Sequence, residues 1–97
     1  MKTKIKTSEL TDANLDWAVS QIEGKYKYYS IDWYAAGPII EREKINLWTE
    51  GYDWEATQYG KWQERGPTPL IAAMRCYVAS KLGNEVEIPE ELTESKS

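Results

Sequence analysis

The chain of 97 residues contains no histidine, no phenylalanine and a single cysteine. Without imidazole, serine triads, Cys-His dyads and the commonest transition-metal sites are excluded. A single thiol can form no disulfide within the chain, which is typical of a reducing cytoplasm. Cys76 is therefore expected to be structural, because no histidine is present to activate it.

Long apolar runs and runs of positive charge are also missing. No apolar stretch approaches the roughly 18 residues of a membrane span, and no signal-peptide pattern opens the chain. Twelve basic and sixteen acidic side chains give a net charge of −4. Binding to a membrane or to a nucleic acid polymer is therefore disfavoured, whereas a compact anion in a local pocket remains compatible with this charge.

The chain is instead rich in tryptophan and tyrosine, with five and seven residues, and ten of these twelve lie between Tyr26 and Trp62. Each ring has a flat apolar face and a polar group, which suits a surface that meets a partner. Some rings must fill the core in place of phenylalanine, and Trp17, Trp48 and Tyr77 are expected there. Those that could stack on a flat heterocycle are Trp33, Tyr34, Trp54, Tyr59 and Trp62.

One mostly buried helix is predicted over residues 69–82. Thr68 is its expected N-cap, Pro69 its first residue and Gly83 its C-terminal stop. Its side chains are apolar on nearly all sides, so we expect it to be packed on nearly all sides. A second helix is predicted between the N-cap Thr11 and Gly24, from apolar residues with helical period.

Two alternating stretches, 3–7 and 84–89, are predicted to be neighbouring strands, because their lysines and glutamates match in spacing and oppose in charge. Between the helices, residues 25–28 and 44–48 alternate as strands do. Residues 38–47 fit strands and loops better than a helix, because Tyr, Trp and Ile are abundant there. The segment Trp48 to Trp62 resembles a long loop or loose hairpin.

These elements predict an α+β fold, with two helices packed on a short, mainly antiparallel sheet. Residues 1–92 are expected to form one domain, because a chain of this length normally folds around a single core. The polar tail, residues 93–97, is predicted to be disordered.

Arg75 is the most informative charge, because it lies along the predicted 69–82 helix in line with small residues. In one interpretation it packs closely and pairs with a structural carboxylate such as Glu41 or Glu43. In the other it binds a phosphate or carboxylate in a cleft floored by alanines. The helix N-terminus at Thr68, beside Arg65, is an anion site in principle, although capping alone would explain it.

The acidic side chains allow a similar pair of interpretations. They could serve acid–base or metal chemistry, but solvated acids and salt-bridge partners explain them better. The residues concerned are Glu41, Glu43, Asp53 and Glu55.

Several stretches resemble the phage NinX family. They are Lys-Thr-Ser-Glu-Leu-Thr (6–11), Leu-Asp-Trp-Ala-Val (15–19), Gly-Pro-Ile-Ile-Glu-Arg-Glu (37–43) and the block from Gly66 to Gly83. The resemblance extends from Lys2 to about Leu92. It supplies no established catalytic residues, and it implies a phage accessory protein that acts in the cytoplasm of the infected bacterial host.

The residues and the resemblance together lead to a hypothesis of binding without catalysis. The protein is expected to act as an anti-defence sponge that sequesters a small anionic, nucleotide-like ligand, such as a host immune signal. No cofactor or metal is expected. The expected ligand-binding residues are Trp33, Gly37, Pro38, Ile39, Glu41, Arg42, Trp54, Arg65, Thr68 and Arg75.

Two alternatives stay open. The first is a protein-interaction module that inhibits a host protein through the same aromatic face. The second is a metal-dependent hydrolase of a nucleotide signal that uses Glu41, Glu43 or Asp53. A site shared across a homo-oligomer would also suit so small a domain.

Overall fold

The computed structural model describes residues 1–93, which form three α-helices and two antiparallel sheets. The elements in chain order are β1 (Lys2–Lys6), η1 (Thr7–Glu9), α1 (Asp12–Glu23), α2 (Trp33–Glu43), β2 (Ile45–Glu50), β3 (Asp53–Gln58), β4 (Trp62–Gly66), α3 (Pro69–Leu82), β5 (Glu85–Pro89) and η2 (Glu90–Leu92). The predicted α+β class is confirmed. Of the tail predicted to be disordered, residues 94–97 lie outside the described residues, and Thr93 closes η2.

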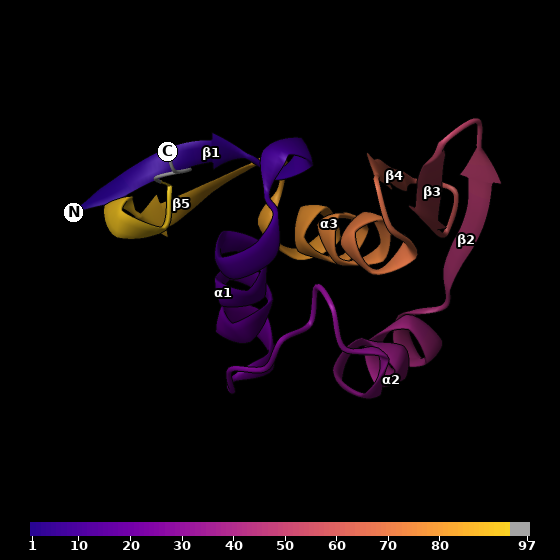
Figure 1. Ribbon diagram of the computed structural model, residues 1–97, viewed down its shortest axis with the longest axis horizontal. Helices are drawn as coiled ribbons and strands as arrows, with labels where there is room; N and C mark the ends of the chain where they lie inside the picture. Colours follow the sequence, from indigo (N-terminus) through magenta and orange to yellow (C-terminus); the bar gives the residue numbers. More distant parts are fainter. Residues whose placement is uncertain (94–97) are drawn as a thin grey trace.

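Helix α3 is the centre of the fold and lies between the two sheets (Figure 1). Nine of its fourteen residues are buried, as expected for a helix that is apolar on nearly all sides. Both predicted ends are confirmed. The Thr68 side chain accepts a hydrogen bond from the Ile71 N–H at 3.1 Å, and Gly83 has a φ of 93° at the C-terminal end.

The strands at the two ends of the chain pair as predicted. β1 and β5 are antiparallel, with Lys4 opposite Glu87 and Lys6 opposite Glu85. They form a separate two-stranded sheet at one end of the molecule, away from the other strands (Figure 1). Helix α1 also matches its prediction: Thr11 is its N-cap, and Gly24, with a φ of 87°, ends it.

Of the two interpretations of residues 48–62, the long loop is wrong, whereas the hairpin is confirmed by the pairing of β2 with β3. Strands β2, β3 and β4 form a three-stranded antiparallel meander, with tight turns that contain Gly51 and Gly60 at positive φ. Strand β3 is hard to recognise from sequence, because Asp, Glu and Gln have low strand propensity. Glu55 and Gln58 in this strand are nevertheless buried.

Two further expectations for the middle of the chain are wrong. Residues 25–28 do not form a strand, and residues 33–43 form the helix α2, so the fold has one helix more than expected. Asp32 caps α2 by accepting a hydrogen bond from the Tyr34 N–H at 3.0 Å. The aromatic and β-branched residues favour strands locally, but burial of one side of α2 overrides this preference. The buried residues are Ala35, Ala36 and Ile39.

The aromatic side chains divide between core and surface in part as expected. Tyr77 is buried and Trp17 is partly buried, but Trp48 is 38% exposed, so its assignment to the core is wrong. Trp54 and Trp62 pack partly buried against the core. The rings of Trp33, Tyr34 and Tyr59, expected to be available for stacking, are exposed.

Candidate functional site

The predicted binding residues fall on two parts of the fold. Trp33 to Arg42 lie on α2. The others lie elsewhere, with Trp54 on β3, Arg65 on β4, Thr68 at the N-cap of α3 and Arg75 in the middle of α3. No hydrogen bond or ion pair within residues 1–93 joins the two groups. The second group includes the two arginines that lie close together.

Arg75 is held by backbone carbonyl groups. Its Nε donates to the Leu10 oxygen and its Nη1 to the Arg65 oxygen, both at 2.7 Å. Burial lowers the pKa of Arg75, against the effect of the acids around it, of which Glu64 contributes most. The expected partners Glu41 and Glu43 are not used. Among the side chains that the structure describes, no carboxylate lies within ion-pair distance of this guanidinium.

Arg65 extends from the end of β4 over the outer face of the sheet. Its Nη2 contacts Glu55 at 2.5 Å and its Nη1 lies 3.9 Å from Asp53. Its side chain is 58% exposed, whereas that of Glu55 is only 5% exposed. Arg65 therefore compensates a buried carboxylate and still presents part of its guanidinium to solvent.

Arg65 and Arg75 line one hollow of about 310 Å³, which we call the arginine hollow. Gly66 and Pro67, just before the N-terminus of α3, also line it. The remaining lining residues are Ser8, Asp53 and Glu64. Thr68 follows directly, but its hydroxyl accepts the Ile71 N–H and caps the helix. The arginine hollow thus combines two cationic groups with two carboxylates.

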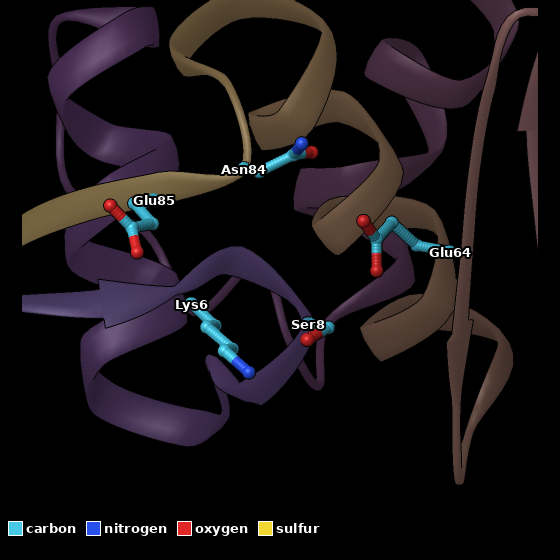
Figure 2. Close-up of a pocket in the computed structure, with 5 residues that line it drawn as sticks. All are labelled: Lys6, Ser8, Glu64, Asn84 and Glu85. Carbon is cyan, nitrogen blue, oxygen red and sulfur yellow. The ribbon is translucent and has the colours of Figure 1, made fainter.

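A second hollow of about 420 Å³ adjoins the first, because Ser8 and Glu64 line both (Figure 2). Its other lining residues are Lys6, Asn84 and Glu85. Burial raises the pKa of Glu64, and the nearby Arg75 lowers it in part. The sequence analysis missed Glu64, although the alternation in β4 places it on the same face as the buried Gly66.

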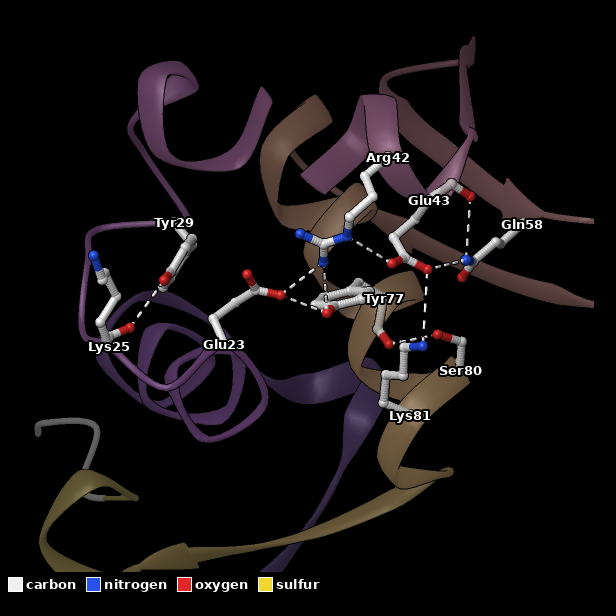
Figure 3. Close-up of polar contacts among 9 residues, drawn as sticks. All are labelled: Glu23, Lys25, Tyr29, Arg42, Glu43, Gln58, Tyr77, Ser80 and Lys81. Carbon is white, nitrogen blue, oxygen red and sulfur yellow. Dashed lines mark hydrogen bonds and ion pairs between the residues drawn. The ribbon is translucent and has the colours of Figure 1, made fainter. Parts of the chain in front are cut away.

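Arg42 belongs to a different arrangement, at the C-terminal ends of α1 and α2 (Figure 3). Its Nη2 donates to Glu23 at 2.8 Å and to the Tyr77 hydroxyl at 2.9 Å, and its Nε donates to Glu43 at 2.9 Å. Glu43 also accepts from the Gln58 amide at 2.9 Å. The hydrogen bonds of Arg42 therefore connect α2 to α1 and to α3.

This network shifts the pKa of its members. Burial raises the pKa of Glu23, but hydrogen bonds from Arg42 and Tyr77 outweigh it, and the net pKa is lowered. The same balance of burial against Arg42 and Gln58 lowers the pKa of Glu43. Burial and the Glu23 carboxylate raise the pKa of Tyr77. These shifts favour the charged form of Glu23 and Glu43, which accept hydrogen bonds, and the protonated form of Tyr77, which donates one.

The other predicted residues of α2 have mixed surroundings. Ile39 is 2% exposed and belongs to the core, and Gly37 is half-buried. Pro38 and Glu41 face solvent, and Trp33 is 54% exposed. Cys76, expected to be structural, is buried, and burial raises the pKa of its thiol to about 12. Its Sγ contacts the Trp62 carbonyl oxygen at 3.4 Å.

The segment from Tyr26 to Tyr34 exposes large side chains unusually densely, and we call it the aromatic segment. Exposure is 52% at Tyr26, 62% at Tyr28 and 86% at Tyr34. Ile31 and Trp33 are 71% and 54% exposed. Tyr29 alone among its tyrosines is buried, and its hydroxyl donates to the Lys25 carbonyl at 2.9 Å, which anchors the segment. Large exposed apolar surfaces often mark a contact with a partner.

A third hollow, of about 290 Å³, lies between the aromatic segment and the first turns of α1, and we call it the tyrosine hollow. Its lining residues are Asp12, Ala13, Asp16, Tyr26, Tyr28, Ser30 and Ile31. The sequence analysis missed it, because it interpreted residues 25–28 as a strand. The helical spacing of Asp12 and Asp16 could be recognised in the sequence. Only the tertiary fold brings Tyr26 and Tyr28 close to them.

Two further properties bear on chemistry. Within residues 1–93, no group of three or more His, Cys, Asp or Glu side chains is arranged to hold a metal ion. Of the acids named for the hydrolase alternative, Glu41 and Glu43 are on α2, whereas Asp53 is the first residue of β3. None of the helices in the described part of the chain is long and apolar enough to cross a bilayer.

These features define a small α+β protein with several surface hollows. The family model described as "Bacteriophage P22, NinX" matches residues 30–81, from the middle of the aromatic segment through α2 and the meander to near the end of α3. The match covers more than half of the chain, so this protein belongs to the phage NinX family, as the resemblance indicated. No curated protein matches the chain.

Proposed function

We propose that this phage protein binds and sequesters a small anionic ligand in the arginine hollow, without catalysis. The observation that carries this proposal is the charge of Arg75. Its two described hydrogen bonds go to neutral carbonyl oxygens, which satisfy donors but do not neutralise the guanidinium. A partly buried charge without an ion-pair partner favours binding of an opposite charge.

The surroundings of Arg75 support an anion further. The half-exposed Arg65 lines the same hollow, and the N-terminus of α3 adds a partial positive charge. A volume of about 310 Å³ lies at the small end of ligand pockets, so the ligand is small. Trp54, expected to stack on a base, does not line the hollow, although its Cα pairs in register with Gly66. The hollow therefore supports a negatively charged ligand more strongly than it supports a ligand with a nucleotide base.

Calorimetric titration tests the proposal with inorganic phosphate, adenosine monophosphate and a cyclic dinucleotide as probes. We expect saturable binding of at least one of these, weakened tenfold or more in Arg65→Gln. The matched control is Lys61→Gln, which removes the same charge from an exposed side chain outside the hollow. Equal loss in both variants, or no binding by any probe, would contradict an anion site here.

A second experiment identifies the natural ligand and tests for catalysis. The purified protein is incubated with a metabolite extract of infected cells, washed and heated, and the released fraction is analysed by mass spectrometry. An intact nucleotide-like species supports sequestration as an anti-defence role in the host cytoplasm. A chemically altered species would instead favour a hydrolase.

The aromatic segment favours a second candidate function, which is binding of a host protein. Tyrosine and tryptophan are enriched at the centres of protein interfaces, and this segment exposes both. Affinity capture from host lysate would test this candidate with a double variant, Trp33→Ala and Tyr34→Ala. A host protein retained by the natural chain and lost with the variant supports it, whereas equal capture by both contradicts it.

A further inference from the structure

The tyrosine hollow carries negative charge that no described cation compensates. Asp12 and Asp16 are four residues apart on α1, so their side chains lie on the same face of the helix. Neither carboxylate has an ion-pair partner within the described part of the chain. Asp16 is only 3% exposed, and burial raises its pKa despite the hydrogen bond from Ser30. A buried carboxylate without an ion-pair partner would be stabilised by a cation bound beside it.

Ser30 supplies an independent indication of a ligand. Its backbone N–H donates to Asp16 Oδ1 at 2.7 Å, which fixes the residue in place. Its side chain lowers the pKa of the Asp16 carboxyl, and its buried hydroxyl oxygen has no hydrogen-bond partner among residues 1–93. Ser30 is 3% exposed and lines the hollow, so a buried polar atom is left without a partner there.

The walls of the hollow suit a cation on an alkyl chain. The rings of Tyr26 and Tyr28 meet edge to face, with centroids 5.8 Å apart. An ammonium group over an aromatic face is attracted by the negative electrostatic potential of that face. Ile31 and Ala13 add apolar surface for methylene groups. Two full carboxylate charges also outweigh the partial positive charge of about half a unit at the start of α1.

We propose that the tyrosine hollow binds a primary alkylammonium group, with Asp12 and Asp16 as counter-charges, the Ser30 hydroxyl as an acceptor and the tyrosine rings around the alkyl chain. This site is distinct from the arginine hollow and takes a ligand of opposite charge. Two sources offer this chemistry: the end of a lysine side chain on a partner protein, or a free polyamine. The matched family stretch begins at residue 30, so most lining residues lie before it.

Titrations followed by ¹⁵N-resolved NMR test the proposal with defined probes. The first is lysine blocked at both its α-amino and carboxyl groups, the second is putrescine, and the neutral control is norleucine blocked in the same way. We expect saturable shifts of the Asp16, Ser30 and Ile31 amides with at least one amine. Norleucine should bind at least tenfold more weakly. Binding of putrescine alone would assign a free polyamine, and binding of blocked lysine would assign a partner protein.

Variants locate the binding to the hollow. Asp12→Asn and Ser30→Ala should each weaken amine binding threefold or more, whereas Glu41→Gln, an equal charge change on exposed α2 surface, should not. Asp16 is left intact, because its hydrogen bond to Ser30 supports the fold. Amide shifts in the variants report that folding is retained. The proposal is overturned if neither amine shifts these amides, if norleucine binds equally, or if Glu41→Gln weakens binding as much as Asp12→Asn.

Discussion

The Nε atom of Arg75 donates a hydrogen bond to the carbonyl oxygen of Leu10, a residue 65 positions earlier in the chain, at 2.7 Å. A second bond joins Arg75 to the Arg65 carbonyl at the end of β4. One side chain thus connects the entry to α1, the last strand of the meander and the central helix. The same two bonds orient the guanidinium in the arginine hollow, so its structural and proposed binding roles depend on each other.

Replacing Arg75 is expected to reduce both stability and anion binding. Arg75→Ala leaves the part-buried carbonyl of Leu10 without its described partner, which costs about 1–3 kcal/mol, and also removes the exposed bond to the Arg65 carbonyl. Urea unfolding measures the loss, and phosphate titration of the folded fraction measures binding. An unchanged midpoint in urea would show that these bonds contribute little.

Gly66 and Gly37 should respond oppositely to alanine. A Cβ at Gly66 would lie 2.7 Å from the backbone nitrogen of Ala72, so Gly66→Ala should destabilise by roughly 1–3 kcal/mol. A Cβ at Gly37 would meet nothing within 4 Å, and alanine is the better helix former by roughly 0.5–1 kcal/mol. Thermal unfolding of the pair checks this, with Gly37→Ala as the control. Two equal shifts would mean that β4 and α3 can separate at little cost.

Arg42 is expected to stabilise the fold without affecting the arginine hollow. Arg42→Gln removes its ion pairs to Glu23 and Glu43. Because the Arg42 side chain is half exposed, solvent screening limits the loss to about 1–2 kcal/mol. Chemical unfolding measures this, and phosphate titration should show unchanged affinity. A matching loss of phosphate affinity would place Arg42 in the anion site after all.

Acid should weaken the fold through Glu23 and Glu43. The pKa of each is lowered in the folded protein from its ordinary value of 4.5. A lowered folded pKa stabilises the protein above the unfolded pKa, and this contribution is lost as the pH falls below about 4.5. The raised pKa of Asp16 acts in the opposite direction. Unfolding free energies from pH 7 to pH 3 should fall less steeply in Glu23→Gln than in the natural chain.

Glu64 is expected to oppose the anion. Burial raises its pKa, and its charged form would repel a bound anion in the shared hollow. Phosphate should therefore bind more tightly as Glu64 becomes protonated with falling pH, and Glu64→Gln should bind more tightly at pH 7 and lose this dependence. Calorimetry across pH with both chains checks this. Weaker binding by Glu64→Gln would show that the carboxylate assists the ligand.

Features that leave a pattern within a short stretch of sequence could be predicted. The ends of α1 and α3 follow from side chains that cap adjacent N–H groups and from glycines that accept positive φ. The pairing of β1 with β5 followed from alternation and opposed charges. Helix α2 could not be predicted in this way. Its Trp, Tyr and Ile residues favour strands locally, and packing of Ala35, Ala36 and Ile39 against the core overrides this preference.

The candidate sites show the same division. The sequence by itself determined the α+β class, the central helix and the NinX family, and it singled out Arg65 and Arg75, which line one hollow, because local spacing and residue chemistry carry that information. Only the tertiary structure decided that Arg42 is held by Glu23 and Tyr77 rather than beside the other arginines. It also brought Tyr26, Tyr28 and Asp16 together around one hollow. Such contacts join residues far apart in the chain, and packing of the whole core decides which of them meet.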